Sequence, residues 1–496
     1  MNNIRFERHR TAVYLLLLTA GALLVHGYHP YIEDAEIYLP GVEQLLNPHL
    51  FPVGKEFFSS HSHMTLFPNL VAGFLRISHI PFEMGLFLLH LTSIFLLLFA
   101  CWRLNCLLFP SSSARWIGVC LIASLLTLPV SGTALYIMDQ YLNPRNLGAF
   151  AGVLAVVSVI KGKYLQVFLW LIAAATVHPL MWVFPASFCA VWFVLGKLET
   201  KFGHVLAEKA AAIPACLGLI VPLVQGGTAP YHEAAKLHAN HYIQHWTWYE
   251  WLGVLAPIFL FWCFGKIAQK QQWFTLARTT RAFAIYGVVY VSLALALDLP
   301  ERFERLARVQ PMRSLHLEYL FLFLCIGGLL GEFVLKRRFW LVLPLFAPLC
   351  LGMFAAQRQL FPKSAHIEWP GSAHKNPWAQ AFVWVRENTP IDAVFVLNPE
   401  YMHVDGEDEI GFRCLAQRSR LADAIKDNGV VSMFPRLAEE WWRQVQSQSP
   451  WEDLTAEDFV RLKQTSGVGW VVIEHEPLPG MDCKYQNEVV KVCRLL

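Results

Sequence analysis

Three acidic residues stand close together near the N-terminus and could act on a proton. Glu33, Asp34 and Glu36 lie a few residues after the first long apolar segment. Because clustered carboxylates repel one another, the pKa of at least one should rise, which suits a general base. The alternative is a solvated acidic turn or a helix N-terminus, which favours acidic side chains. The position beside a membrane segment makes the two interpretations about equally strong.

Histidines form a second group that could bind a ligand. They are His29, His61, His63, His178, His232, His238, His241 and His245. If the segment around His241 is helical, it shares a face with His238 and His245 and could bind a divalent metal together with nearby carboxylates. The spacing HExxH is absent, and histidines at a membrane surface more often form hydrogen bonds. Metal binding is therefore the weaker interpretation.

Arginines form a third group, suited to phosphate. Arg145 and Arg313 each follow an X-Pro pair directly before an apolar segment. A guanidinium group can bind a phosphate through two parallel hydrogen bonds, although either arginine could instead anchor a helix end at the membrane surface. The loop 300–314 adds Arg302 and Arg305. Its arginines could bind a specific anion or could simply reach the phosphates of the outer leaflet.

The elements that must position these groups are membrane helices. Of the 496 residues, 55% are hydrophobic and 16% are charged, and the mean hydropathy is +0.40. Roughly 20 apolar residues cross a bilayer, and the sequence predicts about eleven such spans. They are Thr11–Gly27, Met84–Leu108, Arg115–Leu135, Leu147–Ile160, Tyr164–Val177, Leu180–Leu195, Val205–Val224, Trp251–Phe264, Phe283–Leu297, Ser314–Leu335 and Phe339–Ala356. A shorter apolar run, 66–77, is expected to be re-entrant or interfacial.

The distribution of lysine and arginine predicts the orientation. Basic residues concentrate in alternate loops, which places the N-terminus in the cytoplasm and, after an odd number of spans, the C-terminal tail outside. The first helix is expected to remain uncleaved. The net charge of +3 is small and gives no support for a nucleic-acid partner. We expect a multi-pass protein of a bacterial inner membrane, since the chain has no Asn-x-Ser/Thr sequon.

The chain divides into three parts by composition. Residues 1–356 form the predicted transmembrane part with a long first outer loop, 28–83, and residues 357–377 form a linker rich in proline. Residues 378–496 have the helix and strand patterns of a small α/β domain. The fold class is thus an α-helical polytopic membrane protein with a small extracytoplasmic domain. In that domain, Cys483 and Cys493 could pair across a hairpin.

The first loop resembles the GT-C superfamily of membrane glycosyltransferases, in which an acidic residue follows the first span closely, as Asp34 does here. The segments Ser62–Leu66, Leu142–Arg145 and Thr176–Pro179 are also similar to segments of that superfamily, although the first lacks its two prolines. The tail around 376–420 is similar to tails of uncharacterised bacterial proteins of this type. The resemblance covers the first 200 residues or so and implies about this number of spans and an external domain.

The resemblance implies an activity on sugars carried by polyprenyl phosphate. It implies Asp34, with Glu33 and Glu36 beside it, as the base or acceptor-orienting carboxylate. Substrate would then meet the basic side chains His63, Arg145, His178, Arg302, Arg305 and Arg313.

Other functions stay open. A polymerase or ligase of the O-antigen type would depend on the arginines of 302–313 rather than on the carboxylates. A transporter or assembly protein for envelope glycans is the non-enzymatic alternative. The sequence assigns no cofactor and no protein partner, and it leaves a divalent metal open.

Overall fold

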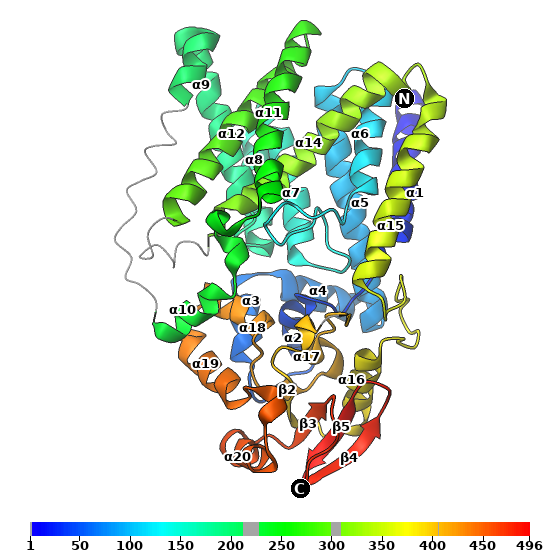
Figure 1. Cartoon of the computed structure of the whole chain (residues 1–496). Coiled ribbons are helices and arrows are strands. Elements are labelled where there is room, and N and C mark those ends of the chain that lie inside the picture. The colour runs from blue at the N-terminus through cyan, green and yellow to red at the C-terminus, as the bar shows by residue number, and fades with distance from the viewer. Residues whose placement is uncertain (1, 212–227, 299–308, 405) are drawn as a thin grey trace.

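The protein consists of a bundle of apolar helices joined to a smaller tail that contains a β-sheet (Figure 1). The computed structural model describes residues 2–211, 228–298, 309–404 and 406–496. The N-terminus lies at the end of the bundle far from the tail, and the C-terminus lies at the opposite end of the molecule. The tail therefore meets only one end of the helical bundle.

The bundle and the first loop are helical throughout most of their length. The helices are α1 (Asn2–His26), α2 (Ala35–Leu46), α3 (Glu56–Met64), α4 (Phe67–Ser78), α5 (Phe82–Leu108), α6 (Ser112–Ser124), α7 (Pro144–Ile160), α8 (Tyr164–Val177), α9 (Val183–Ala211), α10 (Ala229–Lys236), α11 (Trp248–Lys270), α12 (Phe274–Asp298), α14 (Leu315–Leu330) and α15 (Val342–Leu360). The expected re-entrant run 66–77 corresponds to α4.

Six helices in the described part are long and apolar enough to cross a membrane. Three shorter apolar helices accompany them, at Pro144–Ile160, Tyr164–Val177 and Val183–Leu198. The chain is thus a mostly helical, multi-pass membrane protein by the length and composition of its helices. The prediction of about eleven spans is not confirmed, and the expected span Val205–Val224 falls largely outside the described residues.

The expected span Arg115–Leu135 is wrong in its second half. Helix α6 ends at Ser124, and the chain continues as an irregular loop to Asn143, with a short bridge between Pro129 and Tyr136. Apolar residues of this loop, such as Val130 and Leu135, are buried in the protein interior rather than exposed to lipid. Irregular backbone at membrane depth is tolerated when protein surrounds it.

Close helix contacts hold the bundle together. A Cβ atom added at Gly327 of α14 would lie 2.7 Å from the Cα of Gly118 in α6, so the two helices touch through glycines. Small residues at such crossings let helix backbones approach in a membrane. Phe283 of α12 stacks on Phe321 of α14 with ring centroids 4.1 Å apart. These contacts hold α14 in the bundle, directly after the short turn that carries Arg313.

The tail contains a five-stranded sheet with helices on it. Its elements are α16 (Pro377–Asn388), β1 (Val394–Val396), α17 (Phe412–Ala416), β2 (Ser419–Arg420), α18 (Lys426–Met433), α19 (Ala438–Ser447), α20 (Ala456–Ser466), β3 (Trp470–Ile473), β4 (Met481–Gln486) and β5 (Lys491–Leu495). The strand order is β2-β1-β3-β5-β4, with parallel pairs around β1 and antiparallel pairs around β5. The predicted α/β character of the tail is confirmed, and the Thr455 side chain caps the N-terminus of α20.

The first loop packs into the tail and not only onto the bundle. Ile32 and Leu39 of the loop share one buried cluster with Phe382 and Phe412 of the tail. An isolated bridge joins Ile32 to Ile410 of the tail, and a second joins Tyr28 to Ile367 of the linker. The loop 28–83 and the tail thus pack against each other as one unit, and the division of the chain into domains stays a prediction.

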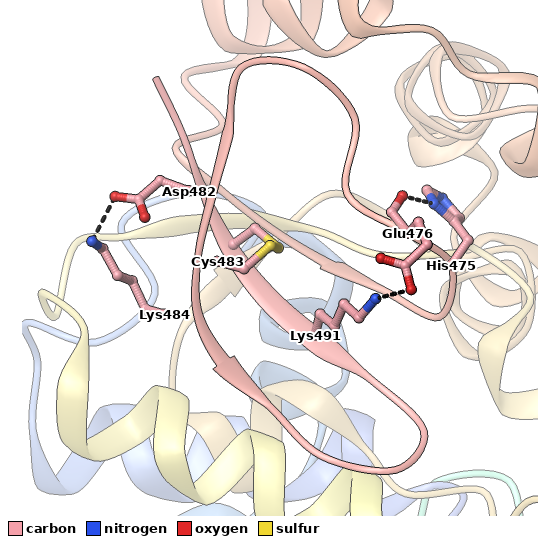
Figure 2. Close-up of a disulfide and its surroundings, with 7 residues drawn as sticks. His475, Glu476, Asp482, Cys483, Lys484 and Lys491 are labelled. Carbon is pink, nitrogen blue, oxygen red and sulfur yellow. Dashed lines mark hydrogen bonds and ion pairs between the residues drawn. A yellow bond between two sulfur atoms is a disulfide. The ribbon is translucent and has the colours of Figure 1, made fainter.

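The pairing of Cys483 with Cys493, which the sequence left open, is present in the structure. The two cysteines lie opposite each other on β4 and β5 and form a disulfide (Figure 2). The same figure shows Lys491 of β5 paired with Glu476 at 2.7 Å. Disulfides persist in oxidising compartments, and the position of the tail outside the cytoplasm stays a prediction.

Candidate functional site

A cavity of about 560 Å³ lies between the ends of the membrane helices and the unit formed by the first loop and tail. We call it the central cavity. It combines acidic, basic and imidazole side chains, which is typical of a ligand site. The charged and imidazole side chains that line it are Glu33, Asp34, His61, Arg145, His178, His238, His241, Arg313, Glu400, His403, Glu409 and Lys426.

Asp34 and Arg145 form an ion pair in this cavity. The Asp34 Oδ2 atom lies 3.4 Å from Nη2 of Arg145, and the Asp34 side chain is 28% exposed. Asp139 binds Arg145 from the other side through two hydrogen bonds, at 3.0 Å to Nε and 2.7 Å to Nη2. Asp139 is buried, and both of its carboxylate oxygens bind the guanidinium of Arg145. The carboxylate of Asp34 lines the cavity instead, where it can bind a ligand.

Local sequence explains how these residues are held. Asn143 caps the N-terminus of α7 by accepting a hydrogen bond of 3.0 Å from the backbone N–H of Arg145, and Pro144 occupies the first turn. Asp34 is the residue preceding α2, and its N–H donates to the Tyr141 hydroxyl at 3.2 Å. Glu33 has a φ of 50°, an uncommon backbone conformation for a residue with a side chain, and it lines the cavity beside Asp34.

The two neighbouring carboxyl groups have opposite pKa shifts. Burial raises the pKa of Glu33 to about 8 against the opposing charge of Lys426, and the negative charges of Glu409 and Asp34 add to the rise. Burial also acts on Asp34, but the positive charges of Arg145 and Lys426 outweigh it and lower the pKa of Asp34 below its usual value. At neutral pH the site therefore holds an ionised Asp34 beside a protonated Glu33.

Arg313 and His178 approach the cavity from the membrane helices. Arg313 lies in a short 3-10 turn, Pro311–Ser314, directly before α14. Its Nε atom is buried, and no described residue accepts a hydrogen bond from it. His178 ends α8, and its Nδ1 atom accepts the backbone N–H of Met181 at 3.2 Å. Arg313 is thus the guanidinium with unused hydrogen-bonding capacity toward an anion.

The tail contributes residues that the sequence alone did not identify. Lys426, the first residue of α18, lines the central cavity and pairs with Glu409 at 3.0 Å. Burial lowers the pKa of Lys426, but Glu409, Asp34 and Glu33 more than reverse this and raise it. Outside the tail, the sequence also did not identify Asp139, which lies six residues before the candidate Arg145 and binds it. For Lys426 no local pattern could have signalled a role, because its partners come from distant segments.

Four of the expected site residues either lie outside the cavity lining or fall outside the described residues. Glu36 is fully buried among Arg413, Arg420 and backbone N–H groups of the tail, and it does not line the cavity. His63 is exposed and also does not line it, whereas His61 does. Arg302 and Arg305 fall outside the described residues.

The histidines of the third loop do not form one helical face. His238 and His241 line the cavity with stacked rings, 4.7 Å between centroids, but the chain around them makes short 3-10 turns and His245 does not line it. In the described ranges, no group of three or more His, Cys, Asp and Glu side chains has the arrangement of a metal site. Burial lowers the pKa of His238 to about 4, so this ring is neutral at physiological pH.

Comparisons with known proteins give little further information. No protein-family model matches the chain, and no curated protein matches it. Among solved structures, the chain is similar to the crystal structure of the Archaeoglobus fulgidus oligosaccharyltransferase in the apo form. The identity is 12% and the TM-score 0.38, over 94% of this chain and 69% of that one. The functional conclusions for this chain therefore come from the residues of the central cavity.

Proposed function

We propose that the chain is a membrane glycosyltransferase that moves a sugar from a polyprenyl-phosphate carrier to an acceptor outside the cytoplasm. The observation that carries this proposal is the Asp34 carboxyl group, paired with Arg145 at 3.4 Å, in a cavity that Arg313 also lines. A carboxylate and a guanidinium with unused donors are the groups that a hydroxyl acceptor and a phosphate donor need. The protein would lie in a bacterial inner membrane with its N-terminus inside.

The reaction uses the cavity residues as follows. The acceptor hydroxyl binds Asp34, its oxygen attacks the anomeric carbon of the sugar, and its proton passes to Asp34. The bond between that carbon and the phosphate oxygen breaks, and the electron pair stays with the phosphate. Arg313 and Lys426 stabilise the charge that develops on the leaving phosphate. The position at the ends of the membrane helices lets a lipid-borne donor reach these groups from the bilayer.

The first experiment measures whether the full-length protein binds the carrier. Native mass spectrometry of gently extracted protein should detect a co-purifying polyprenyl phosphate, because Arg313 offers an unpaired donor to its phosphate. We expect Arg313→Ala to lose it. Arg443→Ala, which removes an exposed arginine of α19 far from the cavity lining, should retain it. Retention by Arg313→Ala equal to wild type would contradict the assigned phosphate site.

The second experiment tests the carboxylate. With a sugar donor identified from the bound carrier, Asp34→Asn should abolish transfer and leave the folded protein and its carrier binding intact. Full transfer by Asp34→Asn together with loss in Arg313→Ala would instead favour an enzyme of the O-antigen polymerase or ligase type. Absence of transfer by wild type, with flux of a lipid-linked glycan in proteoliposomes, would favour a transporter.

A further inference from the structure

A second cavity lies at the end of α15 and is separate from the central cavity. Its volume is about 570 Å³, and we call it the linker cavity because residues 362–369 line much of it. None of its lining residues lines the central cavity. The basic residues Arg358, Lys363 and Lys375 surround it, and no Asp or Glu is among the described residues that line it.

The basic side chains retain capacity for an anion. Arg358 uses its Nη1 atom to hold the carbonyl oxygens of Phe361 and Ser364 at 3.2 and 2.8 Å. Lys363 is paired with Glu407. In the described part of the chain, no carboxylate pairs with Arg358 or with the exposed Lys375. The linker cavity therefore carries a net positive charge that its protein surroundings do not neutralise.

A buried hydroxyl points to a ligand independently of the charges. Ser364 lines the linker cavity and is 3% exposed, and its Oγ atom has no hydrogen-bond partner in the described structure. An unsatisfied buried hydroxyl is costly, so a ligand oxygen or water is expected to complete it. Together with the arginine and lysines, the hydroxyl matches the several acceptor oxygens of a phosphate group.

The surface next to the linker cavity is apolar and faces outward. α15 belongs to the least buried of the candidate membrane spans. On this helix Leu351, Phe354 and Arg358 follow one another at spacings of three and four residues, so they share one face. Leu351 is 68% exposed and Phe354 is 39% exposed. An acyl chain lying along this face would bring its headgroup to Arg358.

An aromatic residue marks the same level of the membrane. Trp369 lines the linker cavity, is 53% exposed and packs its ring against Phe87, 5.5 Å between centroids. Exposed tryptophans gather where the hydrocarbon core meets the headgroups. We propose that the linker cavity binds the phosphate headgroup of an anionic phospholipid, whose acyl chains lie along the exposed face of α15. This site is independent of the proposed glycosyl transfer.

The test compares lipids that differ only in headgroup. The full-length protein in detergent is titrated with phosphatidylglycerol or with phosphatidylcholine of the same acyl chains, and native mass spectrometry counts the retained lipids. We expect preferential retention of phosphatidylglycerol. Lys375→Gln should reduce this preference by about fivefold, the effect of one basic residue near an anionic lipid. Lys375 is exposed and forms no ion pair with a described residue, so the variant should fold.

The control variant changes a lysine that lines neither cavity. Lys484→Gln removes the same charge from β4, outside both cavities, and should retain the wild-type preference. Equal retention of the two lipids by wild type would overturn the proposal, as would an unchanged preference in both Lys375→Gln and Arg358→Gln. Displacement of phosphatidylglycerol by an equal concentration of glycerol phosphate would show a site for a free phosphate ester, and this would also overturn it.

Discussion

Glu36 accepts a hydrogen bond of 2.7 Å from the backbone N–H of Arg413, a residue 377 positions later in the chain. The same carboxylate lies 3.4 Å from the Arg413 guanidinium, which binds Asp427 through two further hydrogen bonds of 2.9 and 2.7 Å. α2 begins directly after Asp34, and α18 begins with Lys426. The buried network thus joins the two helices whose first turns bring Asp34 and Lys426 to the central cavity.

Glu36→Gln should destabilise the unit formed by the first loop and tail. Burial raises the pKa of Glu36 to about 7 against the charges of Arg413 and Arg420, so the carboxylate is ionised above that pH. At pH 8 the change leaves the two arginines buried with less compensating charge, and removal of one partner from a buried ion pair costs about 3–5 kcal/mol. Thermal unfolding in detergent should show a lower Tm. Glu439→Gln, which replaces an exposed carboxylate of α19, is the matched control and should leave Tm unchanged. Equal Tm values for the two variants would contradict a stabilising role for the network.

Asp139→Asn should reduce activity without removing any group that faces the central cavity. Asp139 fixes the Arg145 guanidinium through two hydrogen bonds, and without its charge Arg145 is free to turn further toward Asp34. A displacement of about 1 Å at a reacting group can cost on the order of 100-fold. We expect the loss in kcat, with KM for the acceptor changed much less. Asp482→Asn in the tail hairpin serves as control and should retain the wild-type kcat. A kcat of Asp139→Asn equal to that of wild type would contradict the positioning role of Asp139.

The two histidines of α3 should behave differently. His61 lines the central cavity, and burial lowers its pKa to about 4, so it offers a neutral imidazole to substrate. His61→Ala should lower kcat/KM about tenfold, the loss of roughly one hydrogen bond. His63 is exposed and lies outside the cavity lining, so His63→Ala should retain wild-type kinetics. A loss of kcat/KM in His63→Ala with wild-type kinetics in His61→Ala would contradict this and support His63 as the substrate-binding residue.

The raised pKa of Glu33 predicts that the stability of the protein depends on pH. Burial raises its pKa in the folded protein to about 8, above the value of about 4.3 expected in the unfolded chain. Between these two pH values the folded protein binds more protons than the unfolded chain. The free energy of unfolding therefore falls as the pH rises from about 4.3 to about 8. Glu33→Gln, which cannot ionise, should lack this contribution. The Tm of wild type minus that of Glu33→Gln should therefore decrease between pH 5 and pH 8, and a constant difference would exclude the raised pKa.

The disulfide of the tail hairpin should stabilise the tail. Cys483 and Cys493 close a short loop, and such a crosslink typically contributes about 2–3 kcal/mol. Reductant should lower the Tm at which the tail unfolds in the full-length wild-type protein. The double variant Cys483→Ser and Cys493→Ser should start at that lower Tm and not respond to reductant. A wild-type Tm that is insensitive to complete reduction, verified by thiol labelling, would contradict this expectation.

The sequence by itself determined the membrane character of the chain and the local elements of the tail. Long apolar runs reveal membrane helices because the bilayer sets the length that must be covered. α20 and β3 were predictable because a capping box and a short β-branched run act within a few residues. Hydropathy failed at 125–135, because an apolar residue buried in protein and one facing lipid have the same side chain.

Only the tertiary structure decided which residues form the site. Glu33, Asp34 and Glu36 are neighbours in sequence, yet the turn at Glu33 and the start of α2 send Asp34 to the central cavity and Glu36 to the tail. Lys426 joins them from the far end of the chain. Contacts between such distant segments depend on how several helices pack at once. Local spacing carries the chemistry of each side chain, but only the packing determines its partners.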